Sequence, residues 1–106
     1  MPKYLIEASY TLEGVRGMAK EGGSKRREAA TVAIQGLGGK VEAFYFAFGG
    51  PDAFVIADLP DNATAAAASV AINATGAVNV KTTVLLTPEE IDNAVKKTVN
   101  YRAPGR

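Results

Sequence analysis

Two charged side chains, Glu7 and Lys81, stand alone in otherwise apolar stretches of the sequence. Each stretch alternates like a β-strand, and the two strands are expected to be antiparallel neighbours, so Glu7 and Lys81 could form a cross-strand ion pair. The alternative is a carboxylate that faces an apolar cavity, which is a setting in which a general base can work. The sequence leaves both interpretations open.

A second group of reactive side chains lies in the basic run at residues 22–27, which begins Gly-Gly-Ser. A glycine-rich break directly before a helix leaves free amides at the helix N-terminus, where an anion can bind. The spacing is not that of a Walker motif. The other interpretation is a solvated basic turn that interrupts a helix. The candidate anion-binding residues are Ser24, Lys25, Arg26 and Arg27.

Aromatic residues form the third group, and they either fill the core or line a pocket for a small ligand. The open end of the expected sheet should gather residues from the first two strands, which predicts a pocket there. Glu7 is the only candidate base within reach of this pocket. Its predicted lining is Tyr4, Glu7, Tyr45 and Phe46, and the wider aromatic set adds Tyr10, Phe44, Phe48 and Phe54.

Cysteine and histidine are absent from all 106 residues. Their absence excludes Ser–His and Cys–His nucleophile pairs, thiolate metal sites and histidine ligands to haem. We therefore predict no metal site and no cofactor.

The net charge of +1 provides no general attraction to nucleic acid or to a membrane surface. No apolar run is long enough to span a bilayer, and the start of the chain does not resemble a signal peptide. The sequence thus predicts one cytoplasmic domain over residues 1–106, with neither nucleic acid nor membrane as a partner.

Hydrophobic periodicity predicts where these side chains are placed. Strand-like alternation covers residues 3–10, and a helix capped by Thr11 follows, is interrupted at residues 22–24 and ends at the glycines 38–39. Residues 40–48 and 53–59 read as a hairpin around a Gly-Gly-Pro-Asp turn.

The second half of the chain continues with a helix capped by Asp61 or Asn62 and a strand over residues 78–86. A last helix starts at Thr87, where Pro88 and Glu90 complete a capping box. We expect it to bury a stripe of five residues against the rest of the chain: Ile91, Ala94, Val95, Thr98 and Val99.

This order, β-α-β-β-α-β with an added C-terminal helix, is that of an α+β, ferredoxin-like fold, a four-stranded antiparallel sheet with helices on one face. The second strand is apolar on both sides, and Phe44, Phe46 and Phe48 are expected to face away from the helices. The bare face of the sheet predicts a homodimer, or a multiple of dimers, in which two sheets face each other.

Five segments of the sequence carry a resemblance to a known family: Pro2-Lys3-Tyr4, the break at 22–24, Phe44–Gly49, Leu59-Pro60-Asp61 and the run Lys81–Glu90. Through them the chain resembles the GYD domain family of small bacterial and archaeal proteins. The family's naming tripeptide falls at Gly50-Pro51-Asp52, where proline replaces tyrosine. The resemblance implies a fold of the dimeric α+β barrel type and a largely unassigned biochemical role.

Together these features predict a homo-oligomeric module that binds a small apolar or anionic ligand in an apolar pocket, or that serves assembly. The alternative is a cofactor-independent enzyme of the dimeric α+β barrel type, such as a small monooxygenase or an isomerase. A polar group that points into an enclosed cavity would favour the enzyme. A nucleic-acid reader with the same topology is disfavoured, because residues 53–59 lack the basic and paired aromatic side chains on which bases stack.

Overall fold

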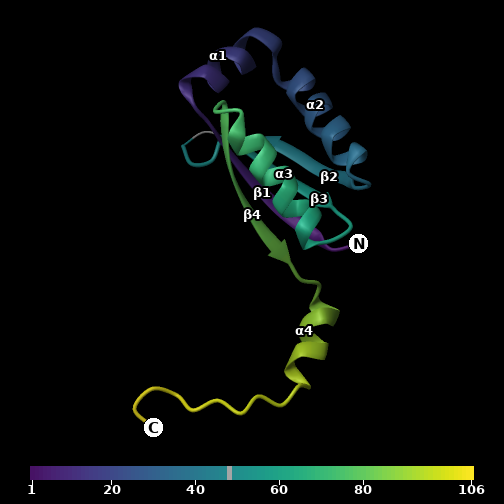
Figure 1. Ribbon diagram of the computed structural model, residues 1–106, viewed down its shortest axis with the longest axis vertical. Coiled ribbons are helices and arrows are strands. Elements are labelled where there is room, and N and C mark those ends of the chain that lie inside the picture. The colour runs from purple at the N-terminus through teal and green to yellow at the C-terminus, as the bar shows by residue number, and fades with distance from the viewer. Residues whose placement is uncertain (48) are drawn as a thin grey trace.

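A computed structural model describes residues 1–47 and 49–106 of the chain. It confirms the α+β class, with one four-stranded antiparallel sheet and the element order β-α-α-β-β-α-β-α, consistent with a ferredoxin-like fold (Figure 1). Phe48, which the sequence places at the end of the second strand, lies outside the described residues. The elements are β1 (Lys3–Tyr10), α1 (Leu12–Glu21), α2 (Gly23–Gly36), β2 (Lys40–Phe46), β3 (Ala53–Asp58), α3 (Asn62–Ala74), β4 (Val78–Leu85) and α4 (Pro88–Val95).

The sheet has the strand order β2-β3-β1-β4, so β1 and β3 form its centre. Alternate side chains of both central strands are buried, and they pack with Ile34 of α2 and Ala65 of α3 in one core. Both helices therefore cover the same face of the sheet, and the opposite face, which we call the open face, carries the half-exposed side chains. The core cluster is Tyr4, Ile6, Ile34, Val55, Ala57, Leu59 and Ala65.

Local signals explain where the helices begin. The Thr11 hydroxyl accepts a hydrogen bond from the Gly14 amide at 3.3 Å, and the Asp61 carboxylate accepts one from the Thr64 amide at 2.8 Å. Hydrogen bonding by Thr64 also lowers the pKa of Asp61. The interruption predicted at residues 22–24 is confined to Gly22, which turns the chain at φ 89° and caps α2, so that α2 begins at Gly23.

The prediction that Phe44 and Phe46 face away from the helices is wrong, and a β-bulge is the reason. The register between β2 and β3 runs from Val41 opposite Ala57 directly to Ala43 opposite Ile56, so β2 carries one extra residue. After this bulge, Phe44 and Phe46 lie opposite buried residues of β3 and face the helices. Tyr45 instead lies on the open face, where it is 72% exposed.

The C-terminal helix also differs from its prediction. Thr87 and Glu90 form the expected capping box, but α4 ends at Val95 and does not pack against the sheet. It stands away from the body at the end of β4, and the chain is 56 Å long in its largest extent (Figure 1). The stripe predicted to be buried is exposed, with Ile91 at 46%, Val95 at 76% and Val99 at 77%.

Gly14 provides a test of how closely α1 approaches the loop before β4. A Cβ atom at Gly14 would lie 2.0 Å from the Ala77 carbonyl oxygen, a backbone atom that also accepts the Thr11 amide. We expect Gly14→Ala to lower the free energy of unfolding by about 1–3 kcal/mol in urea titrations, because the helix or the loop must move. Gly17→Ala on the same helix is the control, since no described atom outside its chain neighbours and the backbone of α1 lies within 4 Å of a Cβ at that position. The control should stabilise the fold by about 0.5–1 kcal/mol, and similar effects of the two changes would contradict this packing.

Candidate functional site

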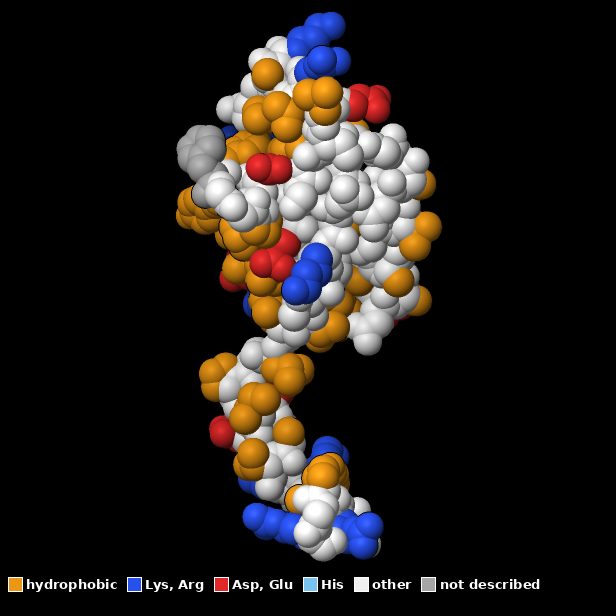
Figure 2. Space-filling view, turned by 90° about the vertical axis from the view of Figure 1, so that its left-hand side faces the viewer, with side chains coloured by type: hydrophobic (Ala, Val, Ile, Leu, Met, Phe, Trp, Pro, Cys, Tyr) orange, Lys and Arg blue, Asp and Glu red, His pale blue; other side chains and the backbone are white. Residues whose placement is uncertain are grey.

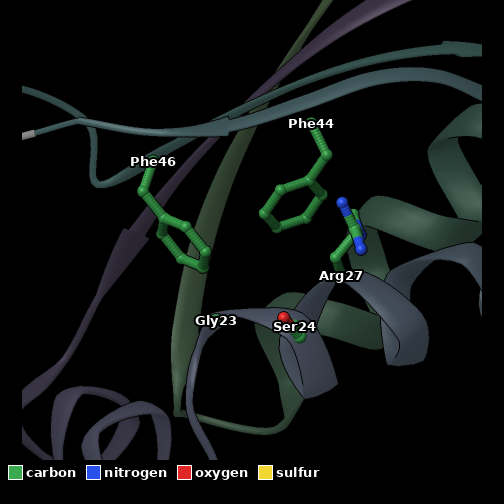
Figure 3. Close-up of a pocket in the computed structure, with 5 residues that line it drawn as sticks. All are labelled: Gly23, Ser24, Arg27, Phe44 and Phe46. Carbon is green, nitrogen blue, oxygen red and sulfur yellow. The ribbon is translucent and has the colours of Figure 1, made fainter.

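Two adjoining cavities lie between the helix pair α1–α2 and the end of β2. The larger is about 440 Å³, and its lining is mainly apolar, with Tyr10, Val15, Met18 and Phe46. The smaller is about 260 Å³ and is lined by the start of α2 and by two rings of β2 (Figure 3). Both cavities share Gly23 and Phe46, and we call them together the α1–α2 groove. The smaller cavity is lined by Gly23, Ser24, Arg27, Phe44 and Phe46.

The β-bulge in β2 and the glycines at the start of α2 shape the floor of the groove. Phe44 and Phe46 point from β2 toward α2, with their ring centroids 5.2 Å apart in an edge-to-face arrangement (Figure 3). A Cβ atom at Gly23 would lie 2.9 Å from the Phe46 ring, so the helix can start this close to the ring only with glycine there. Any larger residue at Gly23 would have to displace Phe46.

Asp52 lies at the edge of the groove and fastens the β2–β3 connection to β1. Its carboxylate accepts a hydrogen bond from the Tyr10 amide at 2.7 Å, and its own amide donates to the Ala8 carbonyl at 2.8 Å. Its carbonyl accepts the Ala47 amide at 2.8 Å. The carboxylate is thus engaged in holding the wall of the groove, in agreement with the role in the turn that the sequence indicates.

The four candidate anion-binding residues separate in the structure. Ser24 and Arg27 project into the smaller cavity, because residues three apart share one face of a helix (Figure 3). Arg26 points elsewhere and forms an ion pair with Glu21 at 3.4 Å, and Lys25 is exposed. The structure therefore brings together two of the four residues, and it places them beside aromatic rings.

The four residues of the predicted pocket do not line one cavity. Tyr4 is 1% exposed on the helix-covered face, where its hydroxyl donates to the Asn62 side chain at 2.5 Å. Glu7 and Tyr45 lie on the open face, because strand side chains alternate and the bulge reverses β2. Only Phe46 lines the α1–α2 groove.

Glu7 and Lys81 lie directly opposite each other in the β1–β4 register, as predicted. No ion pair joins them among the described residues. Lys3 instead forms the ion pairs of this sheet face, with Asp58 at 2.9 Å and Glu42 at 3.0 Å. Hydrogen bonds to the Asp58 and Glu42 carboxylates raise the pKa of Lys3.

Val15 and Met18 are the groove residues that the sequence analysis did not single out. Their spacing predicts an apolar helix stripe, which is correct, but a stripe at this spacing packs into a core in most helices. Nothing in their types or positions shows that the turn at Gly22 leaves part of the stripe open. Within residues 1–47 and 49–106, no cluster of three or more acidic side chains is placed to hold a metal ion, and no helix has the length and apolar character to cross a membrane.

Comparison with known proteins assigns the family. The family model described as GYD domain matches residues 4–95. The chain belongs to the GYD domain family. A comparison with curated proteins gives no match. The match runs from the second residue of β1 to the end of α4, so the groove and nearly all of the open sheet face lie within the GYD domain.

Proposed function

We propose that this GYD domain protein is a homodimeric binding module for a small molecule with an apolar body and an anionic group. The observation that carries the proposal is the α1–α2 groove, where an apolar cavity of about 440 Å³ adjoins a cavity that Ser24 and Arg27 line. A volume of this size is in the range of small-ligand pockets. That the protein is cytoplasmic remains a prediction from the sequence.

The chemistry of the groove supports a divided ligand. Val15, Met18 and Phe46 offer apolar contact to the body of the molecule. The Arg27 guanidinium and the Ser24 hydroxyl offer donors to a carboxylate, sulfonate or phosphate at the other end. Because Arg27 lies at the edge of this apolar surface, one ligand can place its apolar body and its anionic group in the groove at the same time.

Binding accounts for the groove better than the enzymatic alternative does. A general base must lie within hydrogen-bond reach of the proton that it removes. The carboxylate that lines the larger cavity, Asp52, already accepts the Tyr10 amide. Glu7, the base that the sequence suggested, lies on the opposite face of the sheet.

The dimeric part of the proposal rests on the open face of the sheet. Leu5, Phe54 and Ile56 are half-buried there, beside the exposed Tyr45, and no helix within residues 1–47 and 49–106 lies over them. A second copy stacked face to face would cover these apolar residues on both copies in one symmetric contact. Apolar surface of this kind on a monomer is typical of an interface.

A pair of fluorescent probes tests the ligand proposal. 1-Anilinonaphthalene-8-sulfonate has an aromatic body with an anionic group, and N-phenyl-1-naphthylamine has the same body without the charge. We expect Arg27→Gln to weaken binding of the sulfonate about five- to tenfold, because one charge-assisted contact is lost, and to leave the amine unchanged. Titrations by fluorescence give both dissociation constants.

A second variant checks that the probes bind in the groove. Val15→Trp should fill the larger cavity and weaken both probes, whereas Val32→Trp on α2 places the same ring on a residue that is 64% exposed and lines neither cavity. Equal effects of the two tryptophan variants, or unchanged sulfonate binding in Arg27→Gln, would contradict the proposed site.

A further inference from the structure

The segment from Leu86 to Arg106 forms an arm that leaves the body at the end of β4 (Figure 1). Hydrophobic side chains follow this arm over its length, and basic side chains lie toward its end (Figure 2). Five large apolar or aromatic residues of the arm are exposed by 46–77%. They are Leu86, Ile91, Val95, Val99 and Tyr101.

The arm is built as a helix that needs a partner. Thr87 and Glu90 specify its start through both hydrogen bonds of a capping box. A helix of eight residues is nevertheless marginal in water by itself, and most helix stability in proteins comes from packing of the apolar face. The radius of gyration, 16.8 Å against about 13 Å for a compact chain of this length, shows that the arm does not fold back on its own body.

The charges of the arm are arranged along its length. The first half carries the carboxylates Glu89, Glu90 and Asp92, and the second half carries the cations Lys96, Lys97, Arg102 and Arg106. Within the described residues, no ion pair forms inside the arm. Acidic residues near a helix N-terminus and basic residues near its C-terminus favour the helix itself. They also give the arm opposite charge at its two ends.

The position of these charges around the helix is specific. At about 100° per residue, Ile91 and Val95 lie near the centre of the apolar stripe. Lys96 caps α4 with helical backbone angles, φ −80° and ψ −16°, and the Lys97 amide still donates to the Ala94 carbonyl at 3.1 Å. Asp92 and Lys96 therefore lie along one side of this stripe. Glu90 and Lys97 lie along the other side, so each flank carries one acidic and one basic residue.

We propose that the arms of two copies of this chain pair antiparallel across a two-fold axis near Ala94. In this arrangement Asp92 of each copy faces Lys96 of the other, and Glu90 faces Lys97. On both flanks, opposite charges then face each other around the same two-fold axis, and the apolar stripes of the two copies cover each other. A parallel pair would instead bring the acidic halves together and the basic halves together. The arm is thus a self-complementary contact, additional to the stacking of sheets.

Single cysteines test the pairing cleanly, because the chain has none of its own. We expect Ala94→Cys to cross-link into a covalent dimer with a bismaleimide that spans about 8–10 Å, the usual distance between packed helices. Asn93→Cys, adjacent in sequence but on the opposite side of the helix, should cross-link poorly. Glu89→Cys should also fail, because antiparallel pairing separates the two helix starts.

The fraction of covalent dimer on a denaturing gel decides the outcome. Strong cross-linking of Ala94→Cys alone supports the proposal. Equal cross-linking at Ala94 and Asn93 would overturn it, as would cross-linking at Glu89 as strong as at Ala94, or none at any position. The readout is the contact between arms, so it is independent of ligand binding in the α1–α2 groove and of the sheet interface.

A charge exchange tests the proposed ion pairs in the Ala94→Cys background. The single changes Lys96→Glu and Asp92→Lys should each reduce cross-linking, because like charges then face each other at the Asp92–Lys96 contacts. A mixture of the two variants should restore it. Glu90 is left unchanged because its carboxylate accepts the Thr87 amide at 3.0 Å. A mixture that cross-links no better than either variant alone would overturn the antiparallel assignment.

Discussion

Replacing Leu59 with alanine is expected to lower the free energy of unfolding by about 2–5 kcal/mol. Leu59 is 0% exposed and follows directly after β3 in the core cluster, next to Ile34 and the chain at Gly39. Its amide donates to the Pro2 carbonyl at 3.1 Å, which holds the backbone in place when the side chain is shortened. The vacated volume would therefore persist as a cavity, and each lost contact adds to the loss of burial.

Urea titration of the wild type and the variant measures this effect. Leu12→Ala on α1 is the matched control, because Leu12 is 67% exposed and the same atoms are removed from the surface. The control should change the free energy of unfolding by at most about 0.5 kcal/mol. If the two leucine variants lost the same stability, the placement of Leu59 in the core would be incorrect.

The elements and several of their starting points could be predicted because their signals are local. The cap at Thr11, the turn around Gly49–Asp52 and the capping box at Thr87 each depend on residues within a few positions. The strand-like alternation predicted for residues 3–10 is confirmed: Tyr4, Ile6 and Ala8 are buried between less buried neighbours, and both adjacent strands pair with β1 in a regular register. These signals were sufficient for the α+β class and the order of the strands.

The faces of β2 could not be predicted, because a bulge leaves no clear mark in an apolar strand. Phe44, Tyr45 and Phe46 are all compatible with either face, so the pattern alone does not show which of them point toward the helices. One extra residue between Val41 and Ala43 moves every later side chain of β2 to the opposite face of the sheet. The bulge turned Phe44 and Phe46 into the groove. The candidate pocket could not assemble in either register, because Tyr4 and Glu7 lie on opposite faces of β1, and Tyr45 and Phe46 lie on opposite faces of β2.

The α1–α2 groove and the arm were missed for a different reason. Both depend on where an apolar stripe is left without a partner from the same chain, and periodicity reports only that a stripe exists. Val15 and Met18 on α1 and Ile91 and Val95 on α4 have the same spacing as buried stripes. What separates them from core residues is the turn at Gly22 and the path of the chain after β4.

Replacing Tyr45 with aspartate is expected to break the proposed sheet-to-sheet contact, so that a chain without residues 87–106 becomes monomeric at low micromolar concentration. Tyr45 is 72% exposed in the single chain, so the change should leave the fold of each copy intact. In a face-to-face dimer the same carboxylate would enter an apolar contact beside Phe54 without a partner. An unpaired charge in such a place costs about 3–5 kcal/mol, which is roughly a hundred- to several-thousand-fold rise in Kd.

Sedimentation velocity across a concentration series measures the change, with circular dichroism to confirm that the variant is folded. Val70→Asp is the control, because Val70 is 69% exposed on α3, on the helix-covered side of the sheet. Ile56→Asp places the charge on the neighbouring strand of the open face and should act like Tyr45→Asp. The arm can still join copies in these variants, so each is also measured without residues 87–106. A wild-type chain that sediments as a monomer, or a shortened Tyr45→Asp chain that remains as dimeric as its shortened parent, would show that the open face is not the interface.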